Sequence, residues 1–266
     1  MNGAALAQET RLTYASYLEL GLLLDIQRPR SRAHDETMFI IVHQVYELWF
    51  KLLLHELTYL QERLEAGDSD SALHTLRRCV AVLQVAVDQL DVIDTLTPAQ
   101  FAGFRDSLGS ASGAQSAQFR ELEAVLGARD RIVLENYEEG CAERLRIEAA
   151  MNRPSVLDSF LCYVSLQGYP VPAEVLRRNP ALPFEATQPV REVLARVNHD
   201  DLVPAQVAEG LLDLDRLLQE WRHRHIKIVQ RMIGASRGTG GTSGADHLRA
   251  TCATPAFPVL WEVRGA

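Results

Sequence analysis

The sequence predicts an all-α protein, and three observations carry that prediction. Apolar residues recur at alternating steps of four and three, which is the period of a buried helical face. Proline and glycine separate these segments, and no convincing run alternates apolar and polar residues as a half-buried strand does. At 266 residues the chain is long enough to bury a substantial core. We therefore expect one helical-bundle domain spanning residues 1–266.

The first long helix is predicted from residue 36 to a stop at Gly67. Asp35 and Glu36 are acidic and suit a helix N-terminus, whereas glycine suits the end. A second helix follows Asp68 and carries an apolar face from Leu73 to Leu90. The inward stripe of the first helix consists of Phe39, His43, Tyr46, Phe50, Leu53, Leu57, Leu60 and Leu64.

Shorter helices are predicted in the middle of the chain. Thr97 can cap a helix that has Pro98 at its first position and Gln100 completing a capping box. Five prolines between residues 168 and 189 predict an irregular excursion. The intervening helices are expected over 115–126, 128–150 and 155–166, and the last long helix carries Val207, Leu211, Leu214, Leu218, Trp221, His225, Ile228 and Met232 before a stop at Gly234.

Composition excludes several classes of function. The net charge is −8 and the basic residues are scattered, which argues against a nucleic-acid surface. No apolar run suits a membrane span, and the N-terminus lacks export features, so we expect a cytoplasmic protein. The four cysteines lie far apart, which predicts neither a disulfide framework nor a zinc site. The partner is expected to be a small molecule or another protein.

Two histidines occupy positions where the helical stripes call for aliphatic residues. His43 and His225 are both expected to point inward, where an unsatisfied imidazole costs about 1–3 kcal/mol. A core histidine bonded to a backbone carbonyl explains either residue alone. Two such residues on separate long helices favour a bound metal, with iron as the expectation, because cofactors and metals bind between facing bundle helices.

Arg105 and a glycine-rich loop are the other candidates. Arg105 lies one turn after Phe101 and one turn before Leu108, on or beside an apolar stripe. It forms either a structural ion pair or a clamp for a carboxylate, which a guanidinium matches in bidentate geometry. The loop over residues 237–244 lacks the spacing of phosphate-binding motifs. It is either a surface turn or a loop that closes over a ligand.

Four blocks of the sequence form a recognisable set: FIIVHQVYELW at residues 39–49, FRD at 104–106 with SGAQS at 112–116, WRHRH at 221–225, and the glycine-rich loop at 238–244. Together they resemble the tryptophan 2,3-dioxygenase family. The blocks follow the family order, and the likeness runs from about Leu12 to the C-terminus. The resemblance implies an all-α homotetramer that binds one b-type haem per subunit, with ferrous iron activating dioxygen.

The resemblance also implies roles for individual residues. His225 is similar to the proximal iron ligand, and His43 to the catalytic distal histidine that meets the indole N–H of the substrate. Arg105 matches the residue that pairs with the substrate carboxylate. Thr239 matches the loop residue that contacts the ammonium and carboxylate end of the substrate. The remaining substrate-site positions are Phe39, Phe101, Leu108 and Ser112 around the indole, and Tyr14 and Tyr17 in an N-terminal segment, residues 1–30, that reaches a neighbouring subunit.

The implied activity is insertion of dioxygen across the indole C2–C3 bond of L-tryptophan or a close derivative, giving an N-formylkynurenine-type product. One alternative is a monooxygenase of a substituted tryptophan, such as a β-methyl derivative, on the same scaffold. Ala114 keeps it open, because many members carry an aromatic residue there. A second alternative is a haem-binding sensor or carrier without catalysis. Arg105 and Thr239 argue against it, since a pure haem binder has no use for an amino acid clamp.

Overall fold

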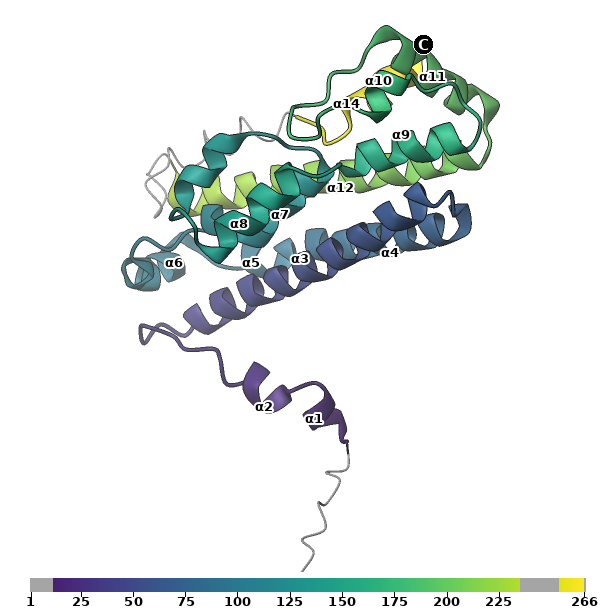
Figure 1. The fold of residues 1–266 in the computed structure, drawn as a ribbon. Helices are drawn as coiled ribbons and strands as arrows, with labels where there is room; N and C mark the ends of the chain where they lie inside the picture. The colour runs from purple at the N-terminus through teal and green to yellow at the C-terminus, as the bar shows by residue number, and fades with distance from the viewer. Residues whose placement is uncertain (1–11, 235–253, 266) are drawn as a thin grey trace, which may run out of the picture.

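The structure is a computed structural model, and its described residues are 12–234 and 254–265. Every element within these residues is helical, which confirms the predicted fold class (Figure 1). The elements, with η for 3-10 helices, are α1 (Tyr14–Tyr17), α2 (Leu20–Leu23), α3 (Glu36–Glu65), α4 (Ser69–Asp88), α5 (Leu90–Asp94), α6 (Pro98–Arg105), η1 (Asp106–Leu108), η2 (Gly113–Gln115), α7 (Ala117–Leu126), η3 (Arg131–Asn136), α8 (Ala142–Met151), α9 (Val156–Leu166), α10 (Ala173–Leu176), α11 (Gln188–Asp200), α12 (Val203–Ile233), α14 (Pro258–Glu262) and η4 (Val263–Gly265).

The three longest helices form the centre of the bundle. Helix α4 packs against both α3 and α12, and α7 and α9 cover another side of α3. Gly210 of α12 packs tightly against α4, because an added Cβ there would lie 3.1 Å from Cδ1 of Leu76. The predicted stripe of α3 is buried from Tyr46 through Phe50, Leu53, Leu57 and Leu60 to Leu64. Its first two positions, Phe39 and His43, are not buried, and Val42 is buried instead.

The start of α3 is fixed by the buried carboxylate of Glu36. It accepts hydrogen bonds from the backbone amides of Arg30 and Ser31, both at 2.7 Å, and from the Ser31 hydroxyl. Burial opposes ionisation of Glu36, but these hydrogen bonds outweigh it and hold its pKa below the usual range. The other end of α3 is closed by Gly67 in the left-handed region, φ 72°, as predicted.

The C-terminal segment is held on α12 by one buried carboxylate. Asp215 is 1% exposed and accepts hydrogen bonds from the amides of Ala256 and Phe257, the indole N–H of Trp261, and the side-chain amide of Gln219. Four donors on one carboxylate satisfy a charge that would otherwise be costly to bury. Asp215 therefore fixes the position of residues 256–261 on α12.

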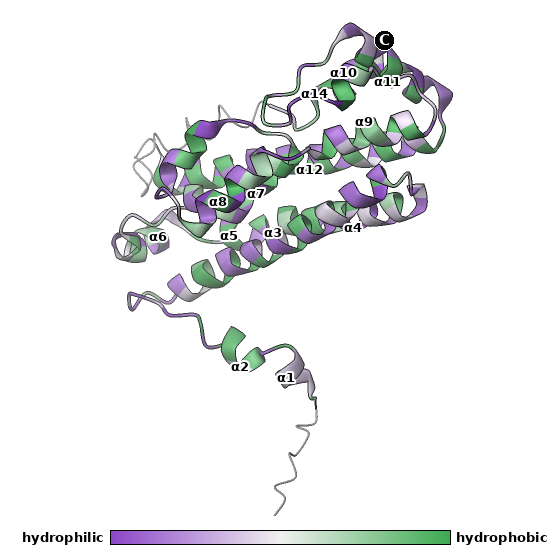
Figure 2. Ribbon diagram, in the orientation of Figure 1, coloured by the Kyte–Doolittle hydropathy of each residue, from purple (hydrophilic) through white to green (hydrophobic). Residues whose placement is uncertain are grey.

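The segments α1 and α2 lie apart from the bundle. Neither contains a buried residue, and both project away from the start of α3 in Figure 1. Figure 2 shows that α2 is nevertheless apolar. Large exposed side chains are concentrated here, at Leu12, Tyr14, Tyr17, Leu22 and Leu24. An exposed group of this kind marks a surface that binds another molecule.

One expectation about the middle of the chain was wrong. Residues 128–150 are not one helix, because Gly140 has a φ of 78° and Cys141 caps a separate helix, α8. Residues before this break form η3, which Asp130 caps. The excursion over residues 168–189 contains one short helix, α10, that packs against α9.

Helix α3 is both long and apolar. Among the described residues it is the one helix that is long and apolar enough, by length and composition, to cross a membrane. The core helix of a globular protein meets the same criterion, and α3 packs its buried face against α4, α7 and α9.

Candidate functional site

His225 lies on an aromatic layer between α3 and α12. Its ring stacks on Trp221, with centroids 5.1 Å apart and planes inclined by 16°. Trp221 in turn contacts Phe119 of α7 at 5.0 Å and Tyr46 and Phe50 of α3 at 5.9 and 6.1 Å. Packing at successive helical turns therefore fixes the plane of the His225 ring.

The nitrogens of His225 lack a hydrogen-bond partner within residues 12–234 and 254–265. Burial lowers the pKa of His225 to about 4, and the nearby His43 contributes in the same direction. The ring is therefore neutral at physiological pH. An unsatisfied neutral imidazole has a free lone pair, which suits it to bind a metal ion.

His43 was expected inside the bundle, but the structure places it at an exposed position on α3. Its Nδ1 lies 2.7 Å from the backbone carbonyl oxygen of Phe39, one turn earlier. A carbonyl oxygen can only accept, so Nδ1–H donates and Nε2 of the neutral ring is an acceptor. Surrounding protein atoms lower the pKa of His43 by desolvation, against the opposing effects of this hydrogen bond and of Glu47.

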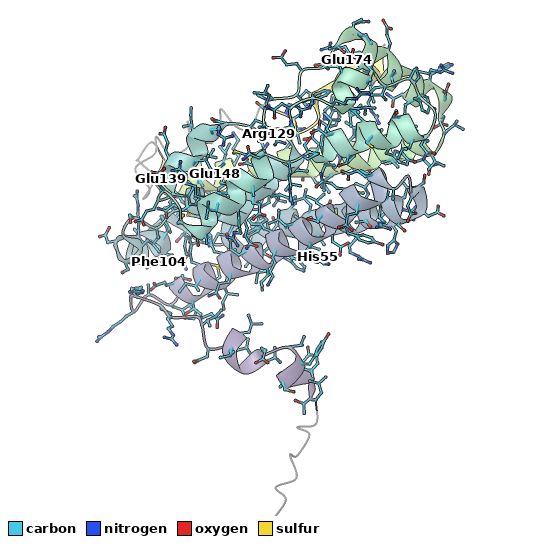
Figure 3. The ribbon with its side chains drawn as sticks, in the orientation of Figure 1. His55, Phe104, Arg129, Glu139, Glu148 and Glu174 are labelled. Carbon is cyan, nitrogen blue, oxygen red and sulfur yellow. The ribbon has the colours of Figure 1, made fainter. Side chains whose placement is uncertain are left out.

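Aromatic residues from α3 and α6 form a wall beside His43. The Phe39 ring lies 4.1 Å from that of His43, 5.9 Å from Phe101 and 5.3 Å from Phe104. Phe104 is buried and holds α6 against the start of α3, as Figure 3 shows at that end of the bundle. Arg105, the last residue of α6, follows Phe104 directly and is partly buried.

The residues after α6 continue along the same edge. Leu108 ends η1 and is partly buried against the core. Ser112 caps η2, and its amide donates to Oε1 of Gln115 at 3.1 Å in a reciprocal capping box. Ala114 lies inside η2 and is partly buried. The three residues thus belong to consecutive short turns between α6 and α7.

The structure does not bring the two predicted N-terminal tyrosines to this site. Tyr14 and Tyr17 are 77% and 71% exposed on α1, away from His43 and His225. Thr239 and the rest of the glycine-rich loop lie outside the described residues. The structure therefore joins Phe39, His43 and Phe101, with Arg105 following on the same helix as Phe101.

Sequence reasoning missed a buried ion triad that joins α7 to α12. Glu123 accepts from Arg120 at 2.7 Å and from Arg222 at 2.6 Å, and each side chain is at most 13% exposed. Two arginines on one carboxylate leave a net positive charge inside the protein. The Nε–H groups of both arginines and the indole N–H of Trp221 have no hydrogen-bond partner among the described residues. The signal in the sequence was Arg222 inside the WRHRH block, next to His225.

The residues present fit a haem, the group that the resemblance implies. Neutral His225 is an ordinary axial ligand for haem iron. The unsatisfied donors of Arg120, Arg222 and Trp221 suit an anionic group, and a b-type haem carries carboxylates. Fold and site together define a class: all-α proteins that hold a prosthetic group between the helices of a bundle.

Comparison with known proteins identifies the family within that class. A family model described as tryptophan 2,3-dioxygenase matches residues 1–147 and 171–266. The chain belongs to the tryptophan 2,3-dioxygenase family. It is 52% identical over 264 residues to the tryptophan 2,3-dioxygenase of Anaeromyxobacter sp. (strain K), with 98% of each chain covered.

More distant relatives carry the same name. The tryptophan 2,3-dioxygenase of Herpetosiphon aurantiacus is 46% identical over 255 residues, covering 95% of this chain and 97% of the relative. That of Caulobacter vibrioides is 38% identical over 258 residues, covering 95% of this chain and 97% of the relative. These names favour the dioxygenase interpretation, and they give no support to the monooxygenase or the non-catalytic carrier.

Proposed function

We propose that this chain is a haem-dependent dioxygenase of tryptophan catabolism that inserts both atoms of dioxygen across the indole C2–C3 bond of L-tryptophan. The product is of the N-formylkynurenine type. The observation that carries the proposal is the setting of two imidazoles on different helices: His225 stacks on Trp221, whereas His43 lies beside Phe39 with Nδ1 bonded to a backbone carbonyl. These separate environments suit separate roles, one toward the haem and one toward the substrate.

His225 holds the iron of haem b in this proposal. Its stacking on Trp221 fixes the ring plane, and its low pKa keeps the lone pair available to the metal. The donors of Arg120, Arg222 and Trp221 are the groups available for the haem carboxylates. When bound in the ferrous state, haem supplies the redox chemistry that activates dioxygen.

His43 orients the indole of the substrate. Because Nδ1–H donates to the carbonyl of Phe39, Nε2 can accept a hydrogen bond from the indole N–H. Phe39 and Phe101 supply flat apolar walls for the ring, and Leu108 and Ser112 line the same region. Orientation of the indole sets its C2–C3 bond toward the oxidant and lowers the entropic part of the barrier.

The amino acid end of tryptophan is bound by polar groups. Arg105 pairs with the carboxylate, for which a guanidinium offers two parallel donors. Thr239 contacts the ammonium and carboxylate end. A zwitterion held at one end and an indole held at the other leave the substrate little freedom. Specificity for tryptophan follows, because a ligand that lacks either end loses the contacts made to that end.

We further propose that the chain works as a single-domain subunit of a cytoplasmic homotetramer. The exposed apolar side chains of α1 and α2, including Tyr14 and Tyr17, support this arrangement, because a partner subunit would cover them. In it, residues 1–30 of one subunit contact the site of its neighbour.

Isotope labelling tests the proposed reaction. The ferrous, haem-loaded protein is incubated with L-tryptophan under ¹⁸O-labelled dioxygen, and the product is analysed by mass spectrometry. We expect a product with two labelled atoms and an opened pyrrole ring. One labelled atom in a product with an intact ring would contradict the proposal and identify a monooxygenase. Absence of tryptophan-dependent oxygen consumption would contradict catalysis altogether.

A further inference from the structure

Glu47 lies on α3 one turn after His43, and both oxygens of its carboxylate accept hydrogen bonds from a different part of the chain. Oε1 accepts from the hydroxyl of Ser116 at 2.6 Å, and Oε2 accepts from the side-chain amide of Gln118 at 2.8 Å. The same amide nitrogen also lies 2.9 Å from the backbone carbonyl oxygen of Glu47. Short bonds to an ionised acceptor are about twice as strong as neutral ones.

Ser116 occupies a junction between two structural elements. Its hydroxyl donates to Glu47 while its oxygen accepts from the amide of Phe119, which makes Ser116 the N-cap of α7. Ser116 also follows η2 directly, and its amide bonds to the carbonyl of Gly113. One carboxylate on α3 therefore fixes both the turn that begins at Ser112 and the first turn of α7.

Both of these elements lead to the candidate site. The turn carries Ser112, which belongs to the proposed substrate site. Helix α7 carries Phe119, which contacts Phe50 and Trp221 in the aromatic layer under His225. Glu47 thus connects the helix of His43 with the segment that borders the substrate region.

We propose that Glu47 is a positioning residue of the substrate site, holding the turn from Ser112 to Ser116 at a fixed place beside His43. The inference rests on the proposed function and adds to it a residue that does not touch the substrate. A displaced turn would widen the site near the substrate. When the hydrogen bond between Glu47 and Ser116 is removed, the affinity for tryptophan therefore falls by a larger factor than kcat.

The hydrogen bond between Glu47 and Ser116 can be removed by substituting either residue, and a conservative substitution can retain it. Glu47→Ala removes both carboxylate acceptors. Ser116→Ala removes the hydroxyl that donates to Glu47 and caps α7, and Ser116→Thr keeps a hydroxyl that can do both. The matched control is Ser159→Ala, which breaks a hydroxyl bond of 2.7 Å to Glu65 at the far end of the same helix. Ser159 is buried on α9 and lies outside the proposed site.

Two measurements on the haem-loaded protein test the proposal: equilibrium titration with tryptophan followed by the haem absorption spectrum, and steady-state kinetics. For Glu47→Ala and Ser116→Ala we expect the Kd and KM for tryptophan to rise about tenfold, equivalent to about 1.4 kcal/mol. The change in kcat is expected to stay within about threefold, with haem content unchanged, and Ser116→Thr is expected to recover most of the affinity. Ser159→Ala is expected to lower thermal stability while leaving the Kd at the parent value.

Equal Kd values for parent, Ser116→Ala and Ser159→Ala would overturn the proposal and leave Glu47 a purely structural residue. Failure of Glu47→Ala to fold does not affect this comparison, because Ser116→Ala alone carries it. A parent protein that does not oxidise tryptophan would instead refute the proposed function, so the two failures are distinguishable.

Discussion

The imidazole of His225 lies nearly parallel to the indole of Trp221, with the two ring planes inclined by 16°. The two residues occupy adjacent turns of α12, and Trp221 is itself held by Tyr46, Phe50 and Phe119. The orientation of the proposed iron ligand is thus set by contacts with α3 and α7. The aromatic layer therefore belongs to the proximal side of the proposed cofactor site.

Arg105→Ala is predicted to raise KM for tryptophan about 10- to 100-fold, since the loss of a charge-assisted pair costs about 1.5–3 kcal/mol. Haem content should not change, because Arg105 contacts the substrate in our proposal and not the cofactor. Arg105→Lys is the control: it keeps the charge but loses the bidentate geometry. Unchanged Michaelis behaviour in Arg105→Ala would remove this residue from the site.

His43→Ala is predicted to retain haem and to lower turnover, because the acceptor for the indole N–H is lost while His225 remains. Absorption spectra of the loaded variant and its kcat with tryptophan test the two parts separately. Loss of haem in His43→Ala would show that the assignments of His43 and His225 to the two sides of the cofactor are reversed.

Asp215→Ala is predicted to lower the free energy of unfolding by about 3–5 kcal/mol, because it leaves buried donors of the C-terminal segment without their acceptor. Urea unfolding of the variant and the parent gives the difference. The matched control on the same helix is Asp213→Ala. Asp213 is exposed, with only a 3.7 Å contact to Arg216, so its removal should cost less than about 1 kcal/mol. Similar losses in the two variants would contradict the role assigned to Asp215.

Asp158 is predicted to contribute to stability in a pH-dependent way. Burial raises its pKa, but hydrogen bonds from Arg178 and Ser155 outweigh this and hold the pKa below the usual value. A carboxyl group with a depressed folded-state pKa stabilises the fold above its unfolded pKa of about 3.9, and loses that effect as pH falls through the folded value. The stability difference between parent and Asp158→Asn should therefore be largest near neutral pH and shrink below about pH 4. A difference that grows on acidification would contradict this assignment.

The long helices were predictable because their signal repeats over many turns. The stripe from Tyr46 to Leu64 and the stop at Gly67 follow from spacing and glycine geometry alone. The failure over residues 128–150 came from a local feature: Gly140 adopts a positive φ and ends the periodic pattern in a turn. Local backbone geometry of this kind is not visible in apolar spacing.

The candidate site was predictable in part. Periodicity identified His43 and His225 as anomalies, and motif resemblance added Arg105 and the residues around it. Periodicity predicted that His43 lies inside the bundle, but the structure places it at an exposed position. The spacing of apolar residues on one helix does not show how far the neighbouring helices extend along it. The contacts of Glu47 with Ser116 and of Glu123 with Arg222 join segments far apart in sequence. The spacing of residues within one segment cannot predict such contacts.

Coordination of haem iron by His225 is the central claim, and one comparison tests it most directly. A His225→Gly variant and the parent are purified together and loaded with haem, and their absorption spectra in the Soret region are compared with and without added imidazole. We predict that the variant loses the axial coordination seen in the parent and that exogenous imidazole restores it. An identical Soret band and identical axial coordination in the two proteins would contradict the account.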